Sequence, residues 1–120
     1  MEKQIREPIG NLKISHEVIA TIASFAAREI EGVASMAVCP GNIKRFLSRS
    51  TTERSIHIEL TDDVAAIDVY VNLRYGAKIP VVSEQIQRSV KEAVQNMTGI
   101  VVAKVNVFVV GIDFEEKAGA

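Results

Sequence analysis

Residues 67–112 decide the fold, and they read IDVYVNLRYGAKIPVVSEQIQRSVKEAVQNMTGIVVAKVNVFVVGI. Apolar and polar residues alternate over positions 67–75, as in a strand with one buried face and one wet face. Apolar residues then recur every three or four positions over residues 80–97, as in an amphipathic helix, and Gly99 supplies its left-handed stop. Alternation resumes over residues 100–112. This block therefore predicts a strand, a helix and a second strand.

The predicted helix and the last strand each have a face that belongs to the core. The helix stripe comprises Val82, Ile86, Val90, Ala93 and Met97, and the strand face comprises Val101, Ala103, Val105, Val107 and Val109. The opposite strand face is apolar too, because it carries Phe108 and Val110 beside Lys104 and Asn106. We expect this second face to need a cover, either from a partner or from a loop containing Phe46 and Leu47.

The first half of the chain predicts a helix and a hairpin. Ser15 has the hydroxyl that caps a helix N-terminus, so it predicts a helix over residues 16–31. The buried stripe of this helix comprises Ile19, Ile22, Ala26, Ile30 and Val33. Residues 56–60 alternate, and Asp62 and Asp63 follow as turn residues before the next strand, which predicts a hairpin. Residues 33–38 predict a further short strand.

These elements predict an α+β fold in the order β-α-β-β-β-α-β, counting a short alternating segment at residues 10–14 as the first strand. The two helices are expected to pack on one face of a mostly antiparallel sheet, which gives a two-layer sandwich. We expect one domain over residues 10–114, a flexible N-terminus at 1–9 and a flexible tail at 115–120.

Composition limits the classes of function. The 120 residues are 48% hydrophobic and 24% charged, as in a folded globular protein. The formal net charge of −1 provides no long-range attraction for nucleic acid or anionic lipid, so neither is the default partner. The single cysteine excludes an internal disulfide, and no export signal or membrane-spanning apolar run precedes the core. We therefore expect a cytoplasmic protein that does not itself insert into the membrane.

The residue types that carry catalysis or metal binding are scattered along the chain. His16, Cys39 and His57 lack the spacing of a metal site. Asp62 and Asp63 are typical of a hairpin turn, and the glycines stand singly at element ends, where they form no phosphate cradle. The sequence therefore predicts no catalytic residue, no cofactor and no metal.

Four basic residues form the one charged run that suggests a partner. Lys44, Arg45, Arg49 and Arg54 face a single acid, Glu53, in an irregular segment. Such a run is usually a solvated loop, yet it is also suited to an acidic protein surface or to phosphate. With Phe108 and Val110 these residues are the candidate interaction surface for a protein partner. A small RNA-binding module that uses residues 44–54 is the alternative, although aromatic stacking residues beside them are scarce.

Short motifs occur in a defined order along the chain, among them Leu60-Thr61-Asp62-Asp63, Tyr75-Gly76, Ile79-Pro80, Asn96-Met97-Thr98-Gly99 and Val110-Gly111-Ile112. Together they resemble the alkaline shock protein family of Gram-positive bacteria, also called the envelope stress response family (the DUF322-type domain). The resemblance implies a small non-enzymatic cytoplasmic protein that is associated with cell-envelope stress and that, in some members, a separate anchor protein recruits to the inner face of the membrane. The absence of catalytic motifs and the doubly apolar last strand lead us to expect an interaction or scaffold module, whose protein partner is a second copy or such a membrane-anchor protein.

Overall fold

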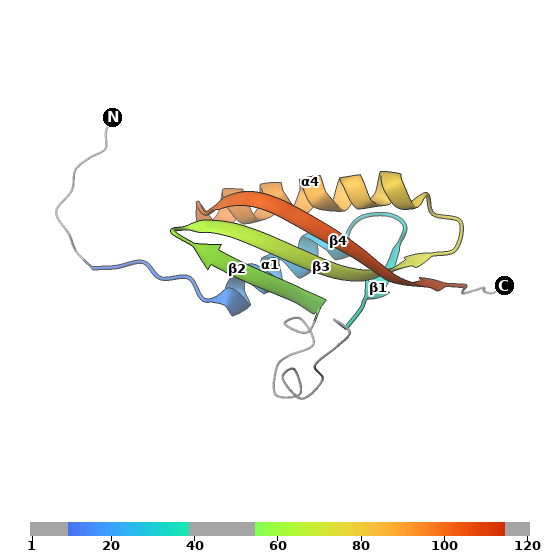
Figure 1. Cartoon of the computed structure of the whole chain (residues 1–120), viewed down its shortest axis with the longest axis horizontal. Coiled ribbons are helices and arrows are strands. Elements are labelled where there is room, and N and C mark those ends of the chain that lie inside the picture. Colours follow the sequence, from blue (N-terminus) through green and yellow to red (C-terminus); the bar gives the residue numbers. More distant parts are fainter. Residues whose placement is uncertain (1–9, 39–54, 115–120) are drawn as a thin grey trace.

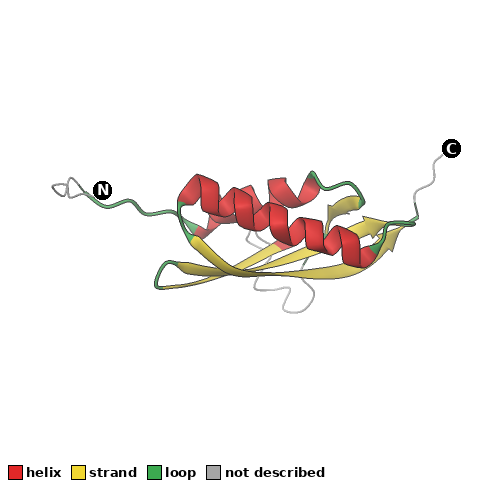
Figure 2. Ribbon diagram, turned by 90° about the horizontal axis from the view of Figure 1, so that it is seen from above, coloured by secondary structure: helices red, strands yellow, loops and turns green. Residues whose placement is uncertain are grey.

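The computed structural model describes residues 10–38 and 55–114, which form two helices and a four-stranded sheet. The elements are α1 (His16–Arg28), β1 (Val33–Met36), β2 (Ile56–Thr61), β3 (Val64–Arg74), α4 (Ile79–Thr98) and β4 (Val101–Asp113). Both helices cover one face of the sheet, and no helix of the described residues lies over the other face, which we call the helix-free face (Figures 1 and 2). The α+β two-layer prediction is confirmed. Predictions for residues 1–9, 39–54 and 115–120 lie outside the described residues.

Strand β3 is the centre of the sheet. Its first half pairs antiparallel with β2, and its second half pairs antiparallel with β1 along the same edge. Its other edge pairs in parallel with β4 over the whole length of β3. Two of the three pairings are thus antiparallel, and the parallel one follows from the α4 crossover that joins β3 to β4.

The expected first strand at residues 10–14 is wrong. These residues adopt no regular secondary structure, and most of their side chains are exposed. A strand is stabilised by ladder hydrogen bonds and by burial of one face, and this segment has neither. The observed order is therefore α-β-β-β-α-β.

The inward face of β3 forms the middle of the core. Ile67, Val69, Val71 and Leu73 are fully buried, as their alternation predicts. On the α4 side, Val82, Ile86, Val90 and Val94 complete the buried layer. Val94 thus takes the place expected for Ala93, which is only partly buried. Met97 is 72% exposed in the last turn of α4, although at seven residues from Val90 it lies on nearly the same side of the helix.

Helix α1 also buries a different stripe from the predicted one. Its buried residues are Ile19, Ala20, Ala23, Ser24 and Ala27. Ile22 and Ala26 are only partly buried against the core. Small side chains on the inner face let α1 lie close to the sheet and to α4, where the Ser89 hydroxyl donates a hydrogen bond to the Ala26 carbonyl at 3.4 Å.

Two β-bulges in β4 change which of its side chains face the core. Val102 lies opposite Ala65 and Lys104 lies opposite Ala66, so Ala103 has no partner on β3. The second shift leaves Val110 without a partner in the same way. Because each bulge reverses the alternation, Val102 rather than Val101 or Ala103 is buried at the start of the strand.

Replacing Ser15 by Ala is expected to destabilise the fold by about 1 kcal/mol. The Ser15 hydroxyl accepts a hydrogen bond from the Val18 N–H at 3.2 Å at the start of α1, as its position in the sequence predicts. Thermal unfolding by circular dichroism measures the cost. A Ser15→Asp variant retains a capping oxygen and serves as the control, so a loss of equal size in both variants contradicts the capping role.

Candidate functional site

An aromatic pair lies on the helix-free face of the sheet. Tyr70 of β3 and Phe108 of β4 are register partners, and their rings stack with centroids 4.8 Å apart and an interplanar angle of 16°. Phe108 remains 43% exposed, because Tyr70 covers only part of it. Val110, at the second bulge, is about equally exposed. The structure thus brings these two predicted surface residues onto the same end of β4.

Polar side chains flank the aromatic pair and hydrogen bond across the strands. The Asn106 amide of β4 donates to the Asp68 carboxylate of β3 at 2.9 Å. The Asn72 amide donates to the Ser35 hydroxyl of β1 at 3.1 Å. These bonds tie three strands together on the wet face, and they leave the asparagine amides and the Asp68 carboxylate engaged in structural contacts.

A second apolar surface lies on α1, and the sequence prediction missed it. Val18, Ile22 and Phe25 recur at spacings of four and three, so they form one stripe on the outer side of the helix, opposite Ala23 and Ala27. Phe25 is 59% exposed. The i, i+4, i+7 spacing of these three residues indicates such a stripe. The predicted core stripe of this helix, however, includes Ile22 and so assigns it to the buried side. We call Val18, Ile22 and Phe25 the outer α1 stripe.

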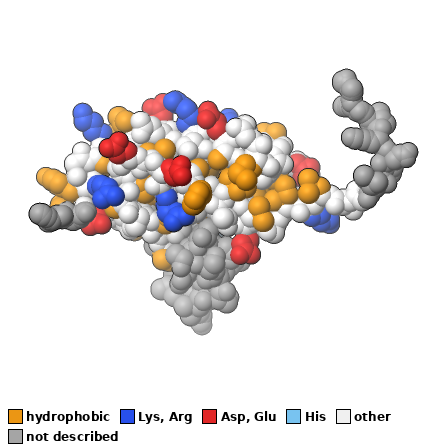
Figure 3. All heavy atoms as spheres, turned by 180° about the vertical axis from the view of Figure 1, so that it is seen from behind, with side chains coloured by type: hydrophobic (Ala, Val, Ile, Leu, Met, Phe, Trp, Pro, Cys, Tyr) orange, Lys and Arg blue, Asp and Glu red, His pale blue; other side chains and the backbone are white. Residues whose placement is uncertain are grey.

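Apolar side chains are also visible on the helix side of the molecule. Hydrophobic side chains gather there at the end from which the N-terminal segment leaves, whereas charged side chains are spread over the rest of the view (Figure 3). The Arg28 guanidinium lies 5.3 Å from the centre of the Phe25 ring, which is a cation–π distance. The outer α1 stripe is therefore a partly exposed apolar surface with a basic residue at its border.

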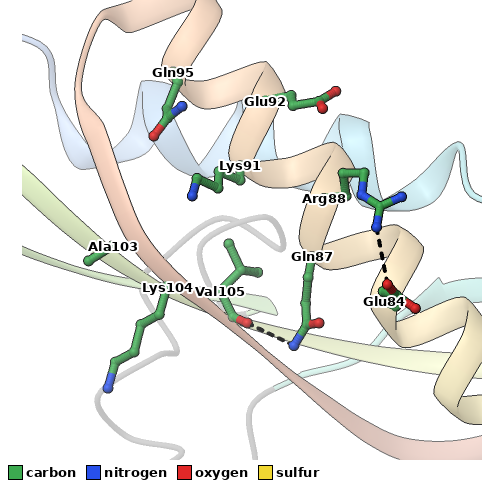
Figure 4. Close-up of a pocket in the computed structure, with 9 residues that line it drawn as sticks. All are labelled: Glu84, Gln87, Arg88, Lys91, Glu92, Gln95, Ala103, Lys104 and Val105. Atoms are coloured by element: carbon green, nitrogen blue, oxygen red, sulfur yellow. Dashed lines mark hydrogen bonds and ion pairs between the residues drawn. The ribbon is translucent and has the colours of Figure 1, made fainter.

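A shallow groove of about 640 Å³ runs between α4 and β4 (Figure 4). Charged groups of both signs line it, and one pair, Arg88 and Glu84, forms an ion pair at 3.1 Å. At its floor, the Gln87 side chain reaches the backbone of β4 and donates to the Val105 carbonyl at 3.1 Å. The groove has no apolar pocket of the kind that holds a small organic ligand.

The remaining predicted residues have separate positions. His16 lies in the first turn of α1 and His57 on β2, where both are exposed and His57 lies 3.6 Å from Glu59. Asp62 and Asp63 form the hairpin turn with positive φ angles, as expected. Cys39, Lys44, Arg45, Arg49 and Arg54 lie outside the described residues, as do Phe46 and Leu47.

The described residues contain neither a metal-binding group nor a membrane-spanning helix. Among residues 10–38 and 55–114, no three His, Cys, Asp or Glu side chains are grouped so that they could hold a metal ion. Within the same residues, neither helix is long and apolar enough to cross a membrane.

Comparison with known proteins gives the family. The sequence profile of the alkaline shock protein 23 family, which is described as having a cell envelope-related function, matches residues 4–114. The chain belongs to this family. The resemblance inferred from the motifs is thereby confirmed.

Relatives at the sequence level support the same assignment. The "Uncharacterized protein YqhY" of Bacillus subtilis (strain 168) is 35% identical over 112 residues, which cover 92% of this chain and 82% of the relative. The "Uncharacterized protein YloU" of the same organism is 30% identical over 115 residues, which cover 93% and 96%. A "Stress response regulator gls24 homolog" of Streptococcus pyogenes serotype M3 is 27% identical over 112 residues, covering 90% of this chain and 62% of the relative.

Among solved structures, "MamM-CTD 215-293" has a similar fold. Its TM-score is 0.50 at 12% sequence identity, and the match covers 81% of this chain and 99% of the other. At this identity the likeness concerns the fold alone.

Proposed function

We propose that this alkaline shock family protein acts in the envelope stress response as a protein-interaction module without catalytic activity. In this proposal it works in the cytoplasm and binds a protein partner, such as a membrane-anchor protein that brings it to the inner face of the membrane. The family assignment supports the envelope role. The observation that carries the interaction role is the outer α1 stripe.

A surface helix that serves only its own core needs one apolar stripe. Helix α1 has a second, because Phe25 and Val18 are exposed on the side opposite its buried alanines. Burying such aliphatic and aromatic groups in an interface contributes roughly 25 cal/mol per Å² of apolar area removed from water. Aromatic residues are also enriched among the side chains that dominate binding energy. Phe25, the largest of the three, is therefore the expected anchor.

The RNA-binding alternative has less support in the described residues. A stacking platform for bases presents free faces of aromatic rings, and the stacking of Tyr70 on Phe108 already covers one face of each of these two rings. The basic residues on which that alternative depends lie outside the described part of the chain. No observation favours it over protein binding.

Replacing Phe25 by Glu is expected to lower the amount of partner captured from cells of the native organism at least tenfold. A carboxylate at the centre of an apolar contact loses the burial of the ring and adds a desolvation cost. Quantitative affinity capture with the tagged full chain measures the effect. Met97→Glu is the matched control, because it changes another exposed apolar side chain, in the last turn of α4, into the same charge.

The expected pattern is loss of a defined partner in Phe25→Glu and normal capture in Met97→Glu, with similar melting temperatures for both. Equal capture by the Phe25→Glu variant and the parent chain would refute the proposed surface. Equal loss in both variants would also count against it, because the loss would then not depend on α1.

A further inference from the structure

The outer edge of β4 is protected along only part of its length. Strand β4 pairs with β3 on one side, and no strand of residues 10–38 or 55–114 pairs with its other side, which is an edge of this sheet. Near its start, two glutamines of α4 bond to this edge: the Gln95 side-chain oxygen accepts from the Val102 N–H at 3.0 Å, and the Gln87 amide donates to the Val105 carbonyl at 3.1 Å. These side chains occupy positions that a neighbouring strand would need (Figure 4).

Farther along β4 this protection ends. Alternate residues of a strand direct their backbone groups to opposite edges, and no bulge separates residues 105 and 109. Val107 and Val109 therefore direct their N–H and C=O groups outward as Val105 does. In the described part of the chain, no hydrogen bond reaches these groups. Figure 1 shows the reason, since β4 diverges from α4 toward its C-terminal end.

The composition of this unprotected edge favours strand pairing. Natural edge strands are usually blocked by lysine, proline or inward-pointing charges. Residues 105–112 contain none of these, and the partly exposed Phe108 lies on the helix-free face beside Tyr70. The bulge at Val110 limits how far a regular ladder extends toward the C-terminus. The open segment is thus short and centred on Phe108.

We propose that two copies of this chain pair through β4 in antiparallel orientation, around a two-fold axis at Phe108. In this register Val107 of each copy lies opposite Val109 of the other, and the two residues exchange both of their backbone hydrogen bonds. Phe108 then lies opposite Phe108 of the second copy in the closer, non-hydrogen-bonded position, about 4.5 Å between Cα atoms. The two rings extend the Tyr70–Phe108 stack across the dimer.

A second copy fits this edge for a specific reason. The edge needs a strand that is unpaired, uncharged and apolar on alternate positions, and residues 106–110 of another chain provide one with an identical set of outward groups. The two-fold axis is perpendicular to the sheet, so both helix layers lie on the same side and the glutamine-protected halves point away from the axis. Because the contact is small, we expect weak, concentration-dependent association.

Disulfide trapping tests the register. In a Cys39→Ser background, Phe108→Cys is expected to form a covalent dimer under mild oxidation, because the proposed Cα separation lies within the range of a disulfide. Val110→Cys is the matched control. Its symmetry mate is displaced by four residues along the strand, roughly 14 Å, so it is expected to stay monomeric. Cross-linking that is absent from Phe108→Cys, or as fast in Val110→Cys, would overturn the proposed pairing.

A second pair of variants tests the same pairing without cysteine. Val107→Pro removes an N–H that β3 does not use, so it is expected to keep the fold and weaken dimerisation at least tenfold in sedimentation equilibrium. Val107→Ala also shortens the side chain but keeps the N–H, so it should dimerise like the parent chain. A parent chain that is monomeric at millimolar concentration would overturn the proposal. The proposal is independent of α1, because Phe25→Glu leaves the β4 edge intact.

Discussion

Replacing Leu73 by Ala is expected to lower the free energy of unfolding by about 2–5 kcal/mol. Leu73 is fully buried on the inward face of β3, with Val33 of β1 and Ile112 of β4 as its register partners on either side. Because hydrogen-bonded strands hold both neighbours in place, the cavity left by the missing atoms collapses only in part. Chemical denaturation followed by circular dichroism measures the change.

Met97→Ala is the control for this prediction. The helical periodicity of residues 80–97 assigns Met97 to the core, whereas the structure leaves most of it exposed on α4. We expect its replacement to change the free energy of unfolding by less than about 0.5 kcal/mol. A Met97→Ala variant that loses as much stability as Leu73→Ala would mean that Met97 is buried in the core, as the periodicity predicts.

Local signals in the sequence predict the helices, the strands from β1 onward and most of their ends. The Ser15 cap, the Asp62-Asp63 turn and the Gly99 stop each depend on a few neighbouring residues, and all three occur in the structure. The inward face of β3 follows equally well from its strict alternation. Short-range interactions can be predicted from a single sequence, because the residues that form them are close together along the chain.

The inner faces of the helices are harder to predict, because the largest apolar side chains of a helix are not always the most buried ones. Helix α1 carries isoleucines on more than one side, and a prediction based on size favours Ile22 over Ala23. The structure buries Ala23 and Ala27 completely, because small residues let the helix approach the sheet. The same error hides the outer α1 stripe, since it assigns Ile22 to the core instead of placing it between Val18 and Phe25.

Which side chains of β4 face the core depends on its pairing with another strand, β3. Nothing in the order of its valines indicates that Ala103 and Val110 have no partner on β3. The sequence does show that one apolar face of this strand is in excess, and Phe108 and Val110 are candidates for that reason. The open edge of β4 is a different kind of feature from this apolar face, because backbone N–H and C=O groups form it. Its extent depends on which of these groups Gln87 and Gln95 hydrogen bond.

Replacing Gly32 by Ala is expected to destabilise the protein by roughly 3 kcal/mol, from two separate costs. Gly32 has a φ of +105°, a region that residues with a Cβ rarely adopt. A Cβ at this position would also lie 2.9 Å from Cγ2 of Val82, in the first turns of α4. Val82 is buried and β-branched, so it has little freedom to move away.

Gly76→Ala separates the two costs. Gly76 has a similar φ of +96°, but nothing lies within 4 Å of the position of an added Cβ. Its replacement should therefore show the backbone cost alone, roughly 1–2 kcal/mol, and the difference between the two variants should report the contact with Val82. A double variant with Val82→Ala tests this assignment, because removing Cγ2 should reduce the additional cost of Gly32→Ala. Equal destabilisation by Gly32→Ala and Gly76→Ala would show that α4 moves away from β1 without cost.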